Sequence, residues 1–395
     1  MKFIIGGDFV PTANNEKIFI DGAVEKIFDT DLINLLKSVD YRVFNLETPL
    51  TDKVCPIKKG GPNLIAPKKT VNLFRAMGVD LFTLANNHIM DQDVAGLNNT
   101  INALKSKGIN YFGVGDDVIK AAKPFVFEKN GIRVGFYACA EHEFSIASHG
   151  KAGANPFDPF ESLDHIVDLK SKCDYVVCLY HGGKEHYQYA SPYLQKVCRK
   201  IIDKGADLVV CQHSHCIGCK EEYNDGLIVY GQGNFLFDLN EENNDKWNHS
   251  LLIEVDFEKS EMKTVFHPII FCNRKLSLCC EKTKNSIMND FNERSKKLLE
   301  ADFIENNFVK EVREKAENYY RPLLNKKDFS KFFYTWDRRL KGLLGKLFVS
   351  NENDEFFNIC MKLYLNCEVH NEVLSVLFEQ RLKETIYEIK DKNNK

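Results

Sequence analysis

The sequence has no excess of basic residues, because 53 lysines and arginines stand against 56 aspartates and glutamates, for a net charge of −3. Proteins that bind nucleic acid need a basic patch or stripe to neutralise the phosphate backbone, and none stands out here. No apolar run approaches the roughly 18 residues that a membrane-spanning helix needs. These absences predict a protein without a nucleic-acid partner and without a transmembrane segment.

The chain also lacks the patterns of a secretory leader and of a disulfide framework. The apolar run over residues 3–5 is far too short for a leader, and it is soon followed by Asp8. The 13 cysteines are an odd number and are scattered through apparent strands and helices, as at Cys139 and Cys360. Free thiols in a reducing compartment fit this pattern, so we expect a cytoplasmic protein.

Alternating apolar runs and amphipathic segments fill the first 270 residues or so. The segments 69–77, 93–107, 159–172 and 191–204 carry apolar residues at three-to-four spacing, which predicts helices between the strands. Strands that alternate with helices indicate βαβ units and parallel pairing. Asn130-Gly131 lies between two strand-like runs and predicts a hairpin. We therefore predict an α/β domain over residues 1–275 with mixed sheets.

The amino-acid composition changes after about residue 280, where glycine and proline become rare and Lys, Glu, Leu and Phe predominate. We predict a helical C-terminal region over residues 285–395, with helices at Glu311–Glu317, Phe329–Leu347 and His370–Lys390. Amphipathic helices of this kind pack on the core, on a protein partner or on a second copy of the chain, and the sequence leaves these alternatives open.

Polar side chains follow the predicted strands at the points where the strands end. In open α/β sheets, ligands collect at the carboxyl ends of the strands. Six such ends deliver carboxylates, amides and imidazoles: Gly6-Gly7-Asp8, Asn45-Leu46-Glu47, Asn86-Asn87-His88, His181-Gly182-Gly183, Gln212-His213-Ser214-His215 and Gly231-Gln232-Gly233-Asn234. Any one of these groups alone is more typical of a turn, a helix cap or a structural hydrogen bond.

The combination points to a metal site. Two carboxylates, one amide and three imidazoles match the ligands that Mn, Fe or Zn prefer. We predict that these six ligands are Asp8, Glu47, Asn87, His181, His213 and His215.

In this order, the motifs resemble those of the calcineurin-like metallophosphoesterase fold. They are most similar to its bacterial capsule-synthesis branch, the CapA/PgsA poly-γ-glutamate proteins. The forms that point to this branch are Asn-Leu-Glu at 45–47, Asn-Asn-His-x-x-Asp at 86–91 and His-Gly-Gly-x-Glu at 181–185. The resemblance covers about residues 1–270, and it implies a four-layer αββα sandwich that holds one or two divalent metal ions.

The resemblance also implies roles for the metal ligands. Glu47 would bridge two ions, and Asp8 and His215 would hold the first. The ligands of the second ion would be Asn87, His181 and His213.

Metal-activated water would then attack a phosphoester or an amide bond. His88 would act as general acid or charge stabiliser, with further catalytic roles for Asp91 and Glu185. Residues placed to contact the substrate are Asn45, His186 and Asn234.

The sequence departs from the wider phosphoesterase pattern at two positions. Val10 stands where a histidine ligand is usual, and Glu47 replaces the usual bridging aspartate. The first site is therefore short of one ligand. Glu47 could chelate with both oxygens, or Asp91 or Glu185 could supply the missing ligand; otherwise a single ion binds tightly.

Two classes of function remain open on these residues. The first is a metal-dependent hydrolase of a capsule, poly-γ-glutamate or cell-envelope polymer, acting on an anionic polymer or a small molecule. The second is a non-catalytic polymer-binding component of such an assembly, built on a phosphoesterase-like scaffold. A scaffold whose helical tail recruits a protein partner is a third, weaker alternative. The substrate itself is not encoded in a recognisable motif.

Overall fold

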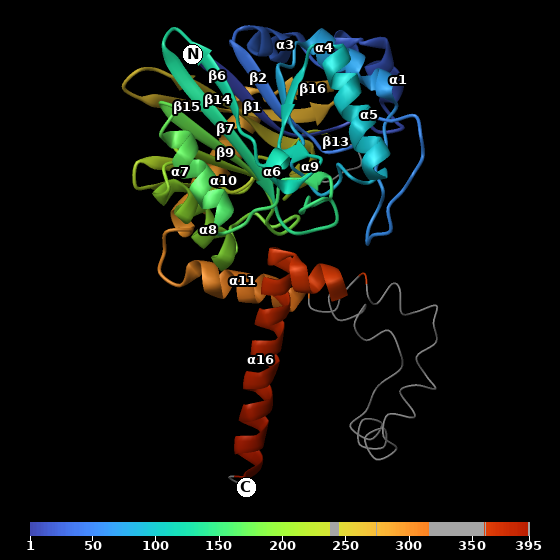
Figure 1. The fold of residues 1–395 in the computed structure, drawn as a ribbon. Helices are drawn as coiled ribbons and strands as arrows, with labels where there is room; N and C mark the ends of the chain where they lie inside the picture. The colour runs from blue at the N-terminus through green and yellow to red at the C-terminus, as the bar shows by residue number, and fades with distance from the viewer. Residues whose placement is uncertain (238–244, 274, 316–358, 360, 394–395) are drawn as a thin grey trace. The chain divides into compact units, whose positions relative to one another are not determined.

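The computed structural model describes residues 1–237, 245–273, 275–315, 359 and 361–393. It divides the chain into two compact units (Figure 1). The first comprises Met1–Ile57 and Asn63–Ile304, and the second comprises Lys58–Pro62 and Glu305–Lys395. The predicted helix Phe329–Leu347 and the thiol of Cys360 lie outside the described residues.

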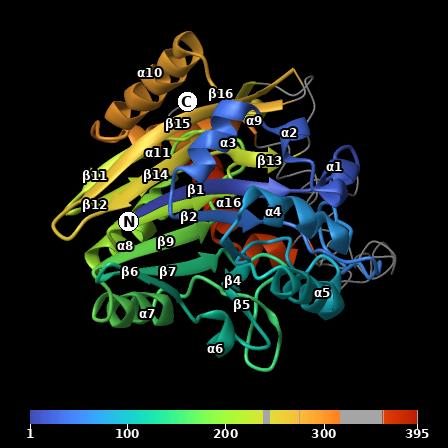
Figure 2. The same cartoon turned by 90° about the horizontal axis from the view of Figure 1, so that it is seen from above.

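The first unit contains a large mixed sheet with the strand order β16-β15-β14-β1-β2-β3-β4, and β13 also pairs with β1 (Figure 2). Its strands are β1 (Lys2–Val10), β2 (Tyr41–Leu46), β3 (Leu81–Thr83), β4 (Asn110–Phe112), β13 (Asn234–Phe237), β14 (His249–Phe257), β15 (Met262–Cys272) and β16 (Lys275–Leu278). The strands β1 to β4 are parallel, whereas β14 to β16 are antiparallel.

A second mixed sheet has the order β11-β12-β10-β9-β7-β6. Its strands are β6 (Phe125–Lys129), β7 (Ile132–Ala140), β9 (Tyr175–His181), β10 (Leu208–Gln212), β11 (Lys220–Tyr223) and β12 (Gly226–Val229). The strands β6 and β7 form the hairpin predicted at Asn130-Gly131, where both residues have positive φ, 56° and 73°. The short strands β5 (Val114–Gly115) and β8 (Gly153–Ala154) form a separate pair.

The two large sheets pack face to face. One apolar cluster joins Phe3 and Val43 of the first sheet to Val177 and Val210 of the second. Successive side chains of a strand point to opposite faces, so Ile4 instead joins the cluster that includes residues of α1 to α5. A third cluster combines residues of α7 and α8 with the outer face of the second sheet. These layers confirm the predicted αββα sandwich.

The helices of the first unit include all four segments predicted from periodicity, now seen as α4, α5, α7 and α8. The full set is α1 (Glu16–Asp21), α2 (Val24–Ile27), α3 (Thr30–Lys37), η1 (Lys68–Thr70), α4 (Val71–Met77), α5 (Asp93–Ser106), α6 (Val118–Ala121), α7 (Glu161–Lys170), α8 (Pro192–Asp203), α9 (Asp245–Asn248) and α10 (Glu281–Lys297). Ser191 caps α8 by accepting from the backbone N–H of Leu194, with Pro192 in the first turn.

Apart from the segment Lys58–Pro62, which lies outside any helix or strand, the described part of the second unit is largely helical. The helix α11 (Phe303–Glu314) leads into it, residues 361–366 are helical, and α16 (Glu368–Asn393) ends the described chain. Among the helices that the structure describes, none combines the length and the apolar run that crossing a bilayer requires.

Candidate metal centre

The carboxyl ends of strands from both sheets bring the predicted ligands together. In the first sheet, Asp8 on β1 lies opposite Asn45 on β2 and Asn234 on β13. In the second sheet, His181 ends β9 and lies opposite Gln212, the last residue of β10, immediately before His213. The six ligands predicted from the sequence are all buried. Strand ends separated by up to 200 positions or so therefore form one polar cluster inside the sandwich.

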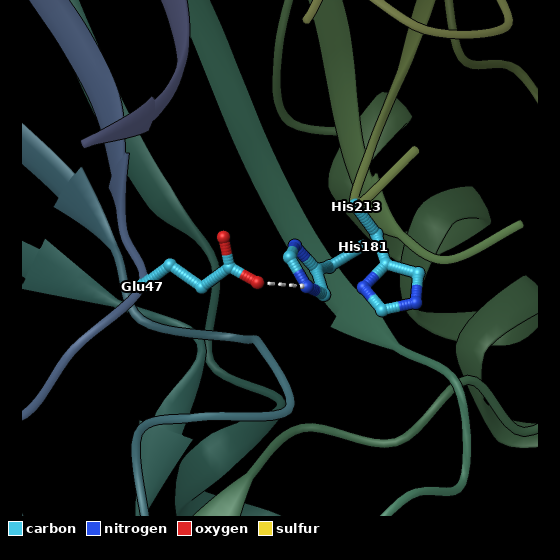
Figure 3. A group of neighbouring side chains, drawn as sticks. All are labelled: Glu47, His181 and His213. Carbon is cyan, nitrogen blue, oxygen red and sulfur yellow. Dashed lines mark ion pairs between the residues drawn. The ribbon is translucent and has the colours of Figure 1, made fainter. Parts of the chain in front are cut away.

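Two groups of ligand atoms share the carboxylate of Glu47. Asp8, Glu47 and His215 each place one ligand atom within 4.8 Å of the others, and so do Glu47, His181 and His213. Figure 3 shows the second group, in which Glu47 points toward His181 and lies 3.2 Å from its Nε2 atom. A carboxylate common to both groups is the arrangement that a bridging ligand requires.

The unsatisfied atoms of this cluster fit a cation. Both carboxylate oxygens of Glu47 are buried and accept no hydrogen bond, and Nδ1 of His213 is also buried without a partner. Buried polar atoms are normally hydrogen-bonded, so orphaned acceptors call for an ion or a water. Carboxylate oxygens and imidazole nitrogens are the donors that Mn, Fe and Zn take. The residues present therefore fit a divalent metal ion.

The carboxylates of the cluster differ in their electrostatics. Burial and, to a smaller extent, the nearby charge of Asp8 together raise the pKa of Glu47 to about 8, against the lowering effect of the histidines. Burial also raises the pKa of Asp8, but the hydrogen bond with His215 and the charges of His181 and His215 outweigh it and bring the pKa to about 2. Without a cation, the centre therefore ionises Asp8 and resists the ionisation of Glu47.

The three imidazoles divide in the same way. Burial lowers the pKa of His181 to about 4 and also lowers the pKa of His213. Burial lowers the pKa of His215 as well, but its hydrogen bond with Asp8 and the charge of Glu47 raise it to about 10. His181 and His213 are thus neutral at pH 7 and ready to act as ligands, whereas His215 holds a proton until a cation replaces it.

The sequence interpretation missed Glu143, which lies in the loop after β7. Its Oε2 accepts a hydrogen bond of 2.8 Å from Nδ2 of Asn87, and its Oε1 lies 3.7 Å from Nε2 of His213. With its NH₂ group held in this way, Asn87 directs Oδ1 toward Nε2 of His181, at 3.1 Å. Glu143 therefore sets the orientation in which the amide oxygen of Asn87 faces the other ligands.

We expect Glu143→Ala to weaken metal binding by about 10–100-fold, the usual effect of losing a group that orients a ligand. Glu143→Gln keeps an acceptor oxygen for Asn87 and should lose much less. Titration calorimetry with Mn²⁺ measures both variants. Equal losses would instead mean that the Glu143 carboxylate binds the ion itself, and an unchanged affinity in Glu143→Ala would refute both roles.

Two residues predicted to contact substrate lie behind the ligands in the structure. Asn45 is fully buried; its Nδ2 donates to Oδ1 of Asp8 at 2.8 Å and lies 3.2 Å from Nδ1 of His181. Asn234 is also buried, and its Oδ1 lies 2.8 Å from Nδ1 of His215. Both amides therefore contact side chains of the predicted ligand set, and their contact with a substrate stays a prediction.

Three of the eight non-glycine residues with positive φ among those the structure describes are histidines at or beside the predicted centre. His213, His215 and His186 have φ values of 85°, 54° and 60°. Non-glycine residues in this left-handed region cost of order 1–3 kcal/mol each and persist where the surrounding structure demands them. The turn after β10 thus holds two histidines in an unfavourable backbone conformation, and this conformation directs both imidazoles into the cluster.

His88 and Asp91 form a separate pair beside the ligands. Nδ1 of His88 lies 2.6 Å from Oδ2 of Asp91, which also accepts from the backbone N–H of Leu64. The backbone N–H of His88 donates to Oδ1 of Asn86, which fixes the turn. Because Asp91 engages Nδ1, proton transfer from this imidazole to a substrate would use Nε2, on the opposite side of the ring.

A family comparison agrees with this geometry. A sequence model of the family described as "Bacterial capsule synthesis protein PGA_cap" matches residues 2–239, more than half of the chain. The chain belongs to this family. The resemblance to capsule-synthesis proteins predicted from the strand-end motifs is confirmed.

Two similar proteins come from Bacillus. The "Capsule biosynthesis protein CapA" of Bacillus anthracis is 33% identical over 214 residues, which cover 51% of this chain and 52% of that protein. The "PGA biosynthesis protein CapA" of Bacillus subtilis (strain 168) is 28% identical over 237 residues, which cover 59% and 62%. The matched region spans less than two thirds of either relative.

Solved structures with a similar course of the chain are distant in sequence. A hypothetical protein from Thermus thermophilus has a TM-score of 0.43 at 14% identity and covers 68% of this chain and 99% of its own. A putative 5′-nucleotidase from Staphylococcus aureus has a TM-score of 0.42 at 12% identity and covers 74% and 58%. Similarities of this size do not decide a function.

The PGA_cap chain departs from the wider phosphoesterase pattern at Val10, which is buried at the end of β1 and pairs with Phe237. Its side chain offers no ligand atom. Of the two predicted substitutes, Glu185 places a carboxylate oxygen within 4.8 Å of ligand atoms of His213 and His215. Asp91 instead pairs with His88. Among the described residues, Glu185 is thus the better candidate for the missing ligand of the first site.

Proposed function

We propose that this PGA_cap protein is a metal-dependent hydrolase that cleaves a phosphoester or amide bond in a capsule or cell-envelope polymer. The observation that carries the proposal is the shared carboxylate of Glu47, which has no hydrogen-bond partner and lies between two groups of imidazole and carboxylate ligands. The substrate class follows from the family description and from the names of the Bacillus relatives. The proposal assigns the activity to the domain predicted over residues 1–275.

The ligands divide between two positions in this proposal. Asp8 and His215 hold one divalent ion, with Glu185 in support, and Glu47 contributes to both positions. The other position uses Asn87, His181 and His213. A divalent ion supplies Lewis-acid polarisation and activates water at neutral pH.

In this proposal the pair His88–Asp91 supplies the proton that the leaving group needs. Asp91 holds Nδ1 of His88 through the 2.6 Å contact and fixes the orientation of the ring. The opposite nitrogen, Nε2, donates the proton to the leaving group. The loop histidine His186, whose ring centroid lies 6.1 Å from that of His215, lines the same side of the centre and contacts the substrate.

A non-catalytic function is the second candidate, and Val10 is the observation that favours it. A centre that lacks one protein ligand holds its first ion less tightly, and such a protein could bind an anionic polymer without cleaving it. In either case we propose that the C-terminal region predicted to be helical over residues 285–395 contacts a protein partner or a second copy. The cytoplasmic location stays a prediction, supported by the free thiols of the cysteines that the structure describes.

Metal analysis of the purified protein tests the proposal directly. We expect one or two bound Mn²⁺ per wild-type chain, and none in the triple variant Asp8→Ala, Glu47→Ala, His213→Ala, whose folding is checked by circular dichroism. A screen with a generic phosphodiester and a γ-glutamyl amide measures turnover. Full metal content in the triple variant would refute the centre. Bound metal without turnover of either substrate would favour the second candidate, a non-catalytic protein that binds the polymer.

A further inference from the structure

A cavity lies in the first unit, beside α10. It encloses about 300 Å³, the lower end of the range for small-molecule sites. The helix α10 packs on β11 and β15 (Figure 2). The polar residues of the cavity that matter here are Gln188, Lys246, His249, Ser286, Asp290 and Arg294. We call this cavity the α10 pocket.

The α10 pocket adjoins the metal centre through Trp247, which stands between Lys246 and His249 in the sequence. The ring centroid of Trp247 lies 5.1 Å from that of His215 and 5.9 Å from that of His186. Its indole N–H donates to the carbonyl oxygen of Phe237 at 3.0 Å, which fixes the ring. Two chain segments, 186–188 and 246–249, therefore line both the pocket and the metal centre.

The charged residues of the α10 pocket carry a net positive charge. They are the cations of Lys246 and Arg294, against the single carboxylate of Asp290. These cations would attract an anionic group of a substrate whose reacting bond lies at the metal centre.

Arg294 is held in place before any ligand binds. Its Nε donates to the carbonyl oxygen of Gly218 at 2.8 Å, and an Nη donates to that of Ile217 at 3.3 Å. The same carbonyl of Ile217 accepts from Nε2 of Gln188 at 3.1 Å. A fixed guanidinium loses little side-chain entropy on binding, and guanidinium and ammonium groups are the usual partners of carboxylates and phosphates.

We infer that the α10 pocket is a subsite for an anionic group of the substrate, a carboxylate or a phosphate, next to the bond that the metal centre acts on. This inference rests on the proposed function for the position of the reacting bond. The pocket holds the part of the substrate beyond Trp247, and its cations select substrates that carry negative charge along the chain.

Binding measured without metal tests the subsite independently of hydrolysis. The probe is a fluorescently labelled pentamer of glutamate, followed by anisotropy in a chelator at about 0.15 M salt, where charges more than a Debye length apart are screened. We expect Ser286→Glu, on the exposed face of α10, to weaken binding by about two- to fivefold. Asp290→Asn should tighten it. Asn292→Glu adds the same charge to α10 outside the pocket and should leave binding unchanged.

The remaining arms separate the possible results. Competition by unlabelled glutamate pentamer but not by inorganic phosphate assigns the subsite to carboxylates, and the reverse assigns it to phosphates. A labelled glutamine pentamer that binds equally well, equal weakening by Ser286→Glu and Asn292→Glu, or no binding of either anion overturns the inference. Loss of metal in the triple variant without a change in pentamer binding would leave the subsite intact, so the two proposals fail separately.

Discussion

Glu47→Gln is expected to abolish tight metal binding and, at the same time, to make the metal-free protein more stable at pH 8. Glutamine keeps the shape of the side chain but removes the carboxylate shared by both ligand groups. We expect Mn²⁺ affinity to fall by at least about 100-fold, the upper end of the loss for a group that only orients a ligand. Titration calorimetry measures this loss.

The stability gain follows from the raised pKa of Glu47. The folded protein holds this proton up to about pH 8, whereas the ordinary pKa of a glutamate in the unfolded chain is 4.5. Between these values the folded state binds more protons, so this group lowers the free energy of unfolding as pH rises through the window. Each unit of pKa shift corresponds to about 1.4 kcal/mol, and we expect Glu47→Gln to recover roughly 2 kcal/mol or more at pH 8. Urea unfolding in a chelator at pH 5 and pH 8 measures it.

Glu221 offers a matched control, because it is a buried glutamate whose charge is compensated. Its carboxylate accepts from Nε of Arg199 at 2.9 Å and from the hydroxyl of Tyr230 at 2.7 Å. Glu221→Gln leaves the Arg199 cation poorly compensated and should destabilise the protein without changing metal affinity. If Glu47→Gln destabilises the metal-free protein as Glu221→Gln does, then an internal contact, such as that with Nε2 of His181 at 3.2 Å, compensates the Glu47 carboxylate, and the stability prediction is refuted.

Much of the fold was predictable from local patterns. The apolar periodicity of four segments predicted the helices α4, α5, α7 and α8, and the Asn130-Gly131 pair predicted a turn. Both signals depend only on residues that are close in the sequence. The pairing of β13 with β1 was not predicted, since it joins Asn234–Phe237 to Asp8–Val10 across more than 200 positions. A strand of four residues leaves little periodicity to detect. Its place is decided by packing against β1, which no local pattern shows.

The site was predictable to the extent that it follows strand ends. The same reasoning applied to β7 would have led to Glu143, because Glu141-His142-Glu143 directly follows Ala140, but this strand end was not among the six considered. The sequence also did not show which polar side chains face a substrate and which are buried against other side chains of the centre. Asn45 near the end of β2 and Asn234 at the start of β13 carry the same amide as Asn87, yet their side chains engage Asp8 and His215. Whether an amide faces a substrate or a neighbouring ligand depends on tertiary contacts between strands of two sheets.

The second large effect is expected on turnover alone. His88→Gln should lower turnover of the substrate by about 10²–10⁴-fold, the usual contribution of a general acid, while the bound metal stays constant. The reason is that His88 pairs with Asp91 and is absent from the ligand groups found among the described residues. Asp91→Asn keeps an acceptor for Nδ1 but removes the charge, so we expect a smaller loss and an altered pH profile.

His149→Gln is the matched control, because His149 is an exposed loop histidine, and it should leave both turnover and metal content unchanged. Metal analysis beside turnover separates the possible roles of His88. Loss of metal together with activity would make His88 a structural support of the centre. Unchanged activity in His88→Gln would remove the proton donor from the mechanism. If His88→Gln loses turnover but keeps its metal, and Asp91→Asn loses less, then Nε2 of His88 takes part in the reaction. A protein that only binds the polymer would not need such a group.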